Sequence, residues 1–128
     1  MINKIKAVQE FHKAFGLGVN ESPIAKLSEK KLQLRFDLMQ EENEEYLEAA
    51  KEDDLVEVAD ALGDMLYILC GTIIEHGMQH KIEEVFNEIQ RSNMSKLGAD
   101  GKPIYREDGK VMKGPNYFKP NIAEILEE

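Results

Sequence analysis

Two acidic runs are the stretches of this 128-residue sequence whose residue types and spacing are best suited to chemistry. They occupy residues 41–45 (EENEE) and 57–60 (EVAD). Both runs lie in segments with the amphipathic period of an α-helix, about 100° per residue. On the first of these helices, Glu42 and Glu45 project toward the apolar side. A carboxylate is seldom buried unless it is paired or binds a metal ion, so both residues are candidate metal ligands.

The spacing of the two runs predicts a cluster of carboxylates. The loop between the helices is short, so we expect an antiparallel hairpin. In an antiparallel hairpin, residues equally far before and after its midpoint lie at the same height on the two facing helices. With the midpoint, or mirror, placed at residue 51, Glu45 faces Glu57 and Glu42 faces Asp60. Four clustered carboxylates repel one another, and a hard divalent cation such as Mg²⁺ or Mn²⁺ relieves the repulsion. The alternative is that they are ordinary surface charges, which is the better explanation for any single Glu.

The elements that must position these residues are expected to be helices, which makes the chain an all-α protein. Four main helices are predicted from apolar periodicity and capping residues. The first ends at Gly16 and Gly18, the second begins after an N-cap at Ser28, the third runs from a cap at Asp53 or Asp54 to Gly77, and the fourth runs from about His80 to Lys96.

The C-terminal part of the chain has a different composition. Residues 97–128 are rich in Gly, Pro, Lys and Asp and are expected to form an extended basic tail. Residues 103–106 and 110–113 flank a turn sequence and predict a small hairpin. Asn121 is the expected cap of a final short turn. With no internal repeat or linker, residues 1–128 are predicted to form a single domain.

Charge is distributed unevenly along the chain. The net charge of −9 argues against general binding to nucleic acid or to an anionic membrane. Residues 37–60 contain eleven acidic side chains, whereas residues 91–120 contain seven Lys and Arg. An acidic metal site combined with a basic segment suits a metal–triphosphate ligand. The single cysteine, Cys70, and the lack of a signal-type or membrane-spanning segment lead us to expect a cytoplasmic protein.

The spacing of residues 41–45 and 57–60 resembles the E-E-x-x-E and E-x-x-D motifs of the MazG-like all-α nucleoside triphosphate pyrophosphohydrolases. The segment from Arg91 to Lys96 and the lysine-rich tail resemble a later motif of the bacterial dUTP-preferring type. The resemblance covers roughly residues 11–120. It implies a four-helix-bundle-like domain, Mg²⁺ or Mn²⁺ as cofactor, and a homodimer or homotetramer.

The resemblance also implies roles for individual residues. The activity would be Mg²⁺-dependent cleavage of a nucleoside triphosphate, such as dUTP or another pyrimidine deoxynucleotide, to the monophosphate and pyrophosphate. The implied metal ligands are Glu42, Glu45, Glu57 and Asp60, with Glu41 and Asp64 as auxiliary residues. The implied substrate-binding residues are Asn93, Lys96, Lys110, Lys113 and Tyr117. From the sequence alone, a solvated helix end is nearly as good an explanation for Asn93 and Lys96.

Two other functions were compared with this one. A di-iron carboxylate bundle needs Glu-x-x-His pairs, and no histidine in the sequence follows a Glu at that spacing. A non-enzymatic helical interaction module, with solvated acidic faces and an apolar third helix that pairs with another chain, remains an alternative function.

Arg35, seven residues before Glu42, is predicted to pair with the acidic cluster or with a partner subunit. The alternative is a solvated guanidinium group with a buried aliphatic stem.

Overall fold

The computed structural model describes residues 1–127 of the chain, and residue 128 of the predicted tail lies outside the described residues. The predicted all-α class is confirmed, because this range contains helices and no β-strand. The chain divides into two compact units, Met1–His80 and Lys81–Glu128. The first contains α1 (Ile2–Ala14), α2 (Glu29–Lys51) and α3 (Leu55–Glu75), and the second contains α4 (Ile82–Met94) and α5 (Ile122–Glu127).

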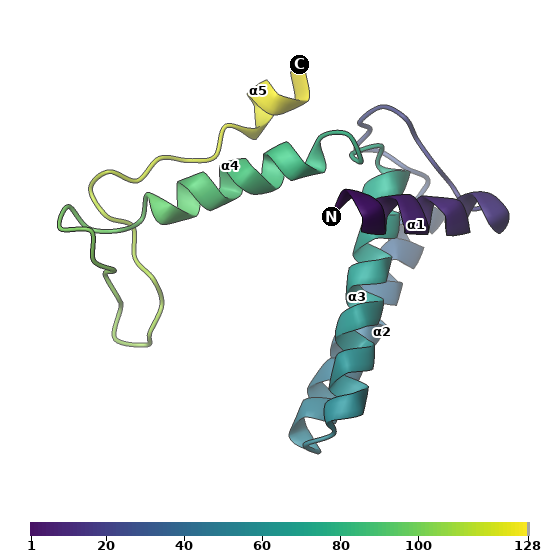
Figure 1. Cartoon of the computed structure of the whole chain (residues 1–128), viewed down its shortest axis with the longest axis horizontal. Coiled ribbons are helices and arrows are strands. Elements are labelled where there is room, and N and C mark those ends of the chain that lie inside the picture. Colours follow the sequence, from purple (N-terminus) through teal and green to yellow (C-terminus); the bar gives the residue numbers. More distant parts are fainter. Residues whose placement is uncertain (128) are drawn as a thin grey trace. The chain divides into compact units, whose positions relative to one another are not determined.

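Helices α2 and α3 form the long antiparallel hairpin that the sequence predicts (Figure 1). Ser28 caps α2 by accepting a hydrogen bond from the Lys31 backbone N–H at 3.2 Å. Asp54 caps α3 in the same way, with the Glu57 backbone N–H as donor at 3.2 Å. The turn between the helices is therefore only residues 52–54, and Asp53 adopts a left-handed φ of 57° within it. Such a short turn fixes which residues of the two helices face each other.

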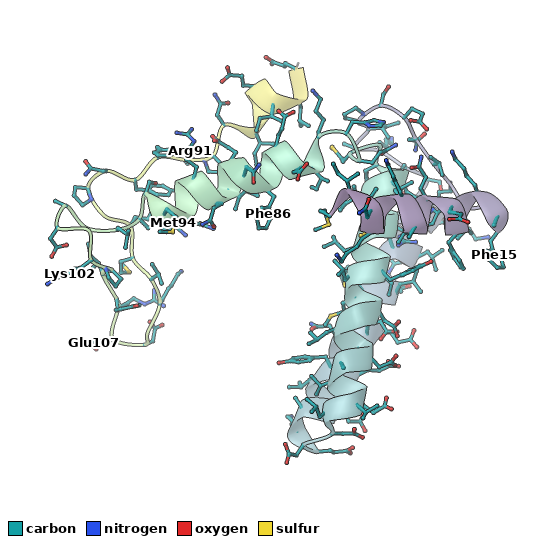
Figure 2. All side chains as sticks on the ribbon, in the orientation of Figure 1. Phe15, Phe86, Arg91, Met94, Lys102 and Glu107 are labelled. Atoms are coloured by element: carbon teal, nitrogen blue, oxygen red, sulfur yellow. The ribbon has the colours of Figure 1, made fainter. Side chains whose placement is uncertain are left out.

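Helix α1 crosses the end of α3 that is remote from this turn (Figure 1). Ile5, Val8 and His12 are buried on this helix. The side chain of Phe15, at the C-terminal end of α1, is 68% exposed (Figure 2). The helix ends at Ala14, so Phe15 is its cap residue and no longer follows the helical period.

The loop after α1 is fastened to the end of α3. The backbone N–H of Asn20 donates to the carbonyl of Ile74 at 3.1 Å, and that of Ile24 donates to His76 at 2.9 Å. Gly77 makes this close approach possible, because its φ is +66° and a Cβ there would lie 2.0 Å from the carbonyl oxygen of Ser22. The loop thus satisfies carbonyl groups that the end of a helix leaves without partners.

In the second unit, α4 is shorter than the predicted span from His80 to Lys96. The buried hydroxyl of Ser92 on α4 donates to the carbonyl of Phe118 at 2.8 Å, while Ser95 accepts from the Phe118 backbone N–H at 3.2 Å. Arg91 lies over the Phe118 ring, 4.4 Å from its centroid (Figure 2). These contacts fold the C-terminal segment back along α4, since α4 and α5 also pack together.

The predicted hairpin in the second unit is reduced to one antiparallel bridge between Tyr105 and Val111. Beside it, the backbone N–H of Met112 donates to the carbonyl of Ile104 at 2.7 Å. The predicted cap at Asn121 is confirmed, because its side chain accepts from the backbone N–H of Glu124 at 3.4 Å. None of the helices within residues 1–127 is long and apolar enough to cross a membrane.

Candidate active site

The register of the α2–α3 hairpin decides which acidic residues meet. Because α2 ends at Lys51 and α3 begins at Leu55, the mirror of the hairpin lies at Asp53. The predicted mirror at residue 51 is wrong by two residues, because residue 51 still belongs to α2. With the observed register, Glu42 faces Asp64 rather than Asp60. Oxygen-bearing side chains line this part of the hairpin (Figure 2).

Glu42 has the most perturbed carboxyl group of the hairpin. Its Oε2 atom is shielded from solvent and has no hydrogen-bond partner. The pKa of Glu42 is raised to about 7. Desolvation is the largest cause, followed by a hydrogen bond with Glu45 and by the negative charges of Glu45, Asp64 and Glu41. The structure thus brings Glu41, Glu42, Glu45 and Asp64 into one electrostatic group.

The remaining two predicted ligands lie outside this group. Glu57 and Asp60 are exposed on α3, and neither is among the charges that raise the pKa of Glu42. Within residues 1–127, no three His, Cys, Asp or Glu side chains are arranged so that they could together hold a metal ion. Asp60 lies one helical turn before Asp64 on α3, and Glu57 lies one turn before Asp60. The assignment of Glu57 and Asp60 as metal ligands therefore stays a prediction.

The chemistry of the group around Glu42 fits a divalent cation. All of its donors are carboxylate oxygens, which Mg²⁺ and Mn²⁺ prefer. The Glu42 oxygen that has no hydrogen-bond partner lowers the stability of the fold. A bound cation would give this oxygen a partner and reduce the repulsion among the carboxylates. The carboxylates of Glu42, Glu45 and Asp64 are not arranged so that the three could hold a cation together. Their role as ligands, with Glu41, Asp60 and Glu57 within one to two helical turns, stays a prediction.

The raised pKa of Glu42 predicts a pH dependence of stability. Its pKa is about 7 in the folded chain, against an ordinary value of 4.5. Between these values the folded state binds more protons than the unfolded state, so this group makes the free energy of unfolding fall as pH rises. Urea unfolding of the metal-free protein and of Glu42→Gln at several pH values measures the effect. The stability difference between the two should change across this window, and a difference independent of pH would contradict the assignment.

The predicted phosphate-binding residues all lie in the second unit, and three of them come together there. The backbone N–H of Gly114 donates to the carbonyl of Lys96 at 2.8 Å, which joins the end of α4 to the tail. The neighbouring Lys113 ammonium lies 4.8 Å from the centre of the Tyr117 ring. A Cβ on Gly114 would lie 2.3 Å from the carbonyl oxygen of Leu97, so this junction requires glycine.

Asn93 and Lys110 are placed differently. Asn93 is exposed near the C-terminal end of α4. Lys110 belongs to the bridged turn, where its backbone N–H donates to the Asp108 carboxylate at 3.1 Å and its carbonyl accepts from Arg106 at 2.8 Å. A phosphate-binding role for Asn93, Lys96, Lys110, Lys113 and Tyr117 remains a prediction.

One buried ion pair was missed by the sequence reasoning. Arg35 pairs with Glu75 at 3.4 Å, not with the carboxylate group around Glu42. Glu75 is 5% exposed and lies at the end of the apolar α3 helix. A glutamate that ends an apolar helical run, on the face of α3 that carries Asp64, is the signal that could have identified it. Lys31 also pairs with Glu75, at 3.5 Å.

Two known proteins are similar to this chain, one in structure and one in sequence. A solved structure of a candidate NTP pyrophosphohydrolase from Exiguobacterium sp. 255-15 superposes with a TM-score of 0.55 and 25% sequence identity, over 98% of this chain and 94% of that one. A protein of Acanthamoeba polyphaga mimivirus, described as uncharacterised, is 38% identical over 69 residues. That match spans 52% of this chain but only 28% of the viral protein.

The profile of a protein family described as phosphoribosyl-ATP pyrophosphohydrolase matches residues 8–93 of the chain. The match includes α2, α3 and the group around Glu42, and it covers more than half of the 128 residues. Members of this family are typically Mg²⁺-dependent hydrolases of acid anhydrides. The chain therefore belongs to the phosphoribosyl-ATP pyrophosphohydrolase family, which is MazG-like.

Proposed function

We propose that this protein is a Mg²⁺-dependent pyrophosphohydrolase that cleaves a nucleoside triphosphate to the monophosphate and pyrophosphate. The observation that carries the proposal is the carboxylate group on the α2–α3 hairpin, with its unpaired Glu42 oxygen and the raised Glu42 pKa. Family membership supports the reaction class. Like charges that raise the pKa of a carboxyl group with a shielded, unpaired oxygen are typical of functional sites.

Each residue of the hairpin has a role in this proposal. Glu42, Glu45 and Asp64 would bind the cation directly, and Glu57 and Asp60 would complete its ligands, with Glu41 beside them. When bound, the cation neutralises the triphosphate and lowers the pKa of a water molecule for attack at the α-phosphorus. Because the pKa of Glu42 is raised to about 7, binding of a cation there would displace the proton that Glu42 holds below this pH, so binding is linked to proton release.

The second unit supplies positive charge in the proposal. Lys96, Lys110 and Lys113 would hold phosphate oxygens and stabilise the charge that develops during the reaction. Asn93 would donate hydrogen bonds from its amide, and Tyr117 orients Lys113 through the contact of its ring with the ammonium group. The proximity of Lys96, Lys113 and Tyr117 supports this role.

The substrate class is tested by a nucleotide screen. From the resemblance to dUTP-preferring enzymes we expect a pyrimidine deoxynucleoside triphosphate, with dUTP first. The family description names phosphoribosyl-ATP, so that compound belongs in the same screen. Each nucleotide is incubated with Mg²⁺, and monophosphate and pyrophosphate are measured. If no nucleotide yields pyrophosphate, the proposal fails and the helical interaction module becomes the better explanation.

A homodimer is expected, because the hairpin exposes more apolar surface than is usual for a lone domain. The exposed apolar side chains of α2 and α3 include Leu34, Phe36, Leu47, Leu55, Val56 and Leu62. Light scattering at micromolar concentration should give at least twice the chain mass of 14.6 kDa. Phe36→Asp, which puts a charge on this surface, should shift the mass toward the monomer. A monomeric wild-type chain would contradict the expectation.

A further inference from the structure

Arg35 joins α2 to α3 through three separate contacts. Its Nε donates to the Thr72 hydroxyl at 3.0 Å, and Nη2 donates to the carbonyl of Ile68 at 2.7 Å. Its Nη1 lies 3.4 Å from Glu75 Oε2, and the two side chains are 10% and 7% exposed. The planar guanidinium group therefore touches three residues on one face of α3, in a site where water competes little.

Gly71 makes room for this contact. A Cβ at position 71 would lie 2.7 Å from Arg35 Nη2 and 2.8 Å from the Nε2 atom of His12. His12 is itself held in place, since its Nδ1 is 2.9 Å from the carbonyl oxygen of Gly18. A side chain at position 71 would displace the guanidinium of Arg35 or the ring of His12 on α1, so Gly71 lets both take their observed positions.

The position of Arg35 along the hairpin links it to the candidate active site. Glu42 is seven residues after Arg35, and Asp64 is seven residues before Gly71. Seven residues are nearly two helical turns, so each pair shares one face of its helix at a separation of about 10 Å. A rotation or shift of α2 at Arg35 would therefore move Glu42 by a similar amount. The turn at residues 52–54 fixes the hairpin on the opposite side of Glu42.

We infer that Arg35, seated against Gly71, Thr72 and Glu75, is a positioning residue that sets the rotation and register of α2 and so holds Glu42 and Glu45 against Asp64. This inference rests on the proposed function, because the position of these carboxylates matters there for binding of a cation. Arg35 has no contact with the carboxylates themselves. Its effect on the site passes through the rigid α2 helix.

Arg35→Lys is the first test. Lysine keeps the charge opposite Glu75, but its single ammonium group cannot reproduce the fork that contacts three residues at once. Mn²⁺ affinity in the absence of nucleotide should fall about 10- to 100-fold, the usual effect of residues that orient metal ligands. The value of kcat should fall as well, while KM changes little, because the predicted phosphate contacts lie elsewhere. Mn²⁺ affinity is measured by electron paramagnetic resonance well below the melting temperature.

Lys31→Met is the matched control. Lys31 contacts the same Glu75 carboxylate, but its side chain is 48% exposed and its recorded ion pair is to Glu75 alone. Mn²⁺ affinity and kcat should match those of the wild type. Thr72→Val removes one acceptor of Arg35 at nearly constant volume, and it should weaken Mn²⁺ binding a few-fold. If Arg35→Lys does not fold, the Mn²⁺ affinity of Thr72→Val tests whether Arg35 positions the carboxylates.

A distance measurement tests the positioning without any ligand. Spin labels at Lys30 on α2 and Ala59 on α3, both exposed, are introduced into a Cys70→Ala chain and diluted with unlabelled protein. Arg35→Lys, or Thr72→Val where the former does not fold, should shift or broaden the label–label distance by about 1.5 Å or more, one residue of helical rise. Lys31→Met should leave it unchanged.

The outcomes separate this inference from the proposed function. A wild-type chain that binds no Mn²⁺ and cleaves no nucleotide would overturn the proposed function, and the label distance would still decide the role of Arg35. A variant with wild-type Mn²⁺ affinity and label distance, even with a lower melting temperature, would overturn the inference and leave Arg35 a purely stabilising residue.

Discussion

Glu42→Gln is expected to lower kcat with Mg²⁺ by roughly 1000-fold, the upper range for loss of one preorganised charge-stabilising group. The amide keeps the shape of the side chain but removes the negative charge at the oxygen that lacks a partner. Without a cation, the same change should raise the melting temperature, because it removes the repulsion that Glu45, Asp64 and Glu41 exert on Glu42. Loss of activity together with a gain in stability distinguishes a functional carboxylate from a structural one.

The matched control is Glu44→Gln, on the same helix and exposed. It removes one negative charge from the same acidic run, but Glu44 is not among the groups that perturb Glu42. Its kcat should stay within about twofold of the wild type, since surface changes away from such features have small effects. Equal losses in the two variants would mean that the total charge of the run, and not the position of Glu42, supports activity.

Lys96→Ala is expected to lower kcat/KM by about 10- to 1000-fold, the effect of losing one or two charge-assisted contacts of roughly 1.5–3 kcal/mol each. Lys96 lies where Gly114 joins the tail to α4, beside Lys113. Mn²⁺ affinity without nucleotide should not change, because the predicted metal ligands are all on α2 and α3. Steady-state kinetics and Mn²⁺ binding measure the two effects separately.

Lys102→Ala is the control for that lysine. Lys102 is exposed in the loop after α4 (Figure 2), and its backbone N–H donates to the Asp100 carboxylate at 3.0 Å. It carries the same charge in the same unit but has no predicted phosphate contact, so its kcat/KM should resemble that of the wild type. If Lys96→Ala has the kinetics of the wild type, Lys96 does not bind phosphate and is a solvated side chain at the end of its helix.

The helices could be predicted from the sequence because their signals are local. Ser28 and Asp54 cap α2 and α3 through their own side chains, and Gly16 and Gly77 follow the ends of α1 and α3 in left-handed conformations. Asn121 likewise caps α5. Such capping signals depend only on neighbouring residues, so they predict where a helix begins or ends without knowledge of its tertiary contacts.

The contacts between helices were harder to predict. The acidic cluster was predicted from the sequence, but a mirror placed two residues too early paired Glu42 with Asp60 instead of Asp64. Residue 51 continues α2, and the left-handed conformation of Asp53 that ends the turn has no glycine to signal it. Moving the mirror by two residues moves the facing residue by four, about 6 Å or roughly one helical turn, which changes which side chains meet.

Arg35 shows a second limit of sequence reasoning. It was predicted to pair with the acidic cluster or a partner subunit, or else to be solvated, but its partner is Glu75, forty residues away. The acidic run nearby in the sequence was a possible partner, but the packing of α2 on α3 places Arg35 against Glu75. The fold of residues 92–118 was missed for the same reason, because the hydroxyl of Ser92 finds its acceptor at Phe118 only after the tail folds back.

Product analysis tests the central claim most directly. The purified chain is incubated with the preferred nucleoside triphosphate and Mg²⁺ in ¹⁸O-labelled water, and the products are identified by mass spectrometry. We predict monophosphate and pyrophosphate in equal amounts, with the label in the monophosphate because water attacks the α-phosphorus. Neither product should form with EDTA, and Glu42→Gln should form both roughly 1000-fold more slowly. Nucleoside diphosphate with free phosphate, or cleavage that persists with EDTA, would contradict the account.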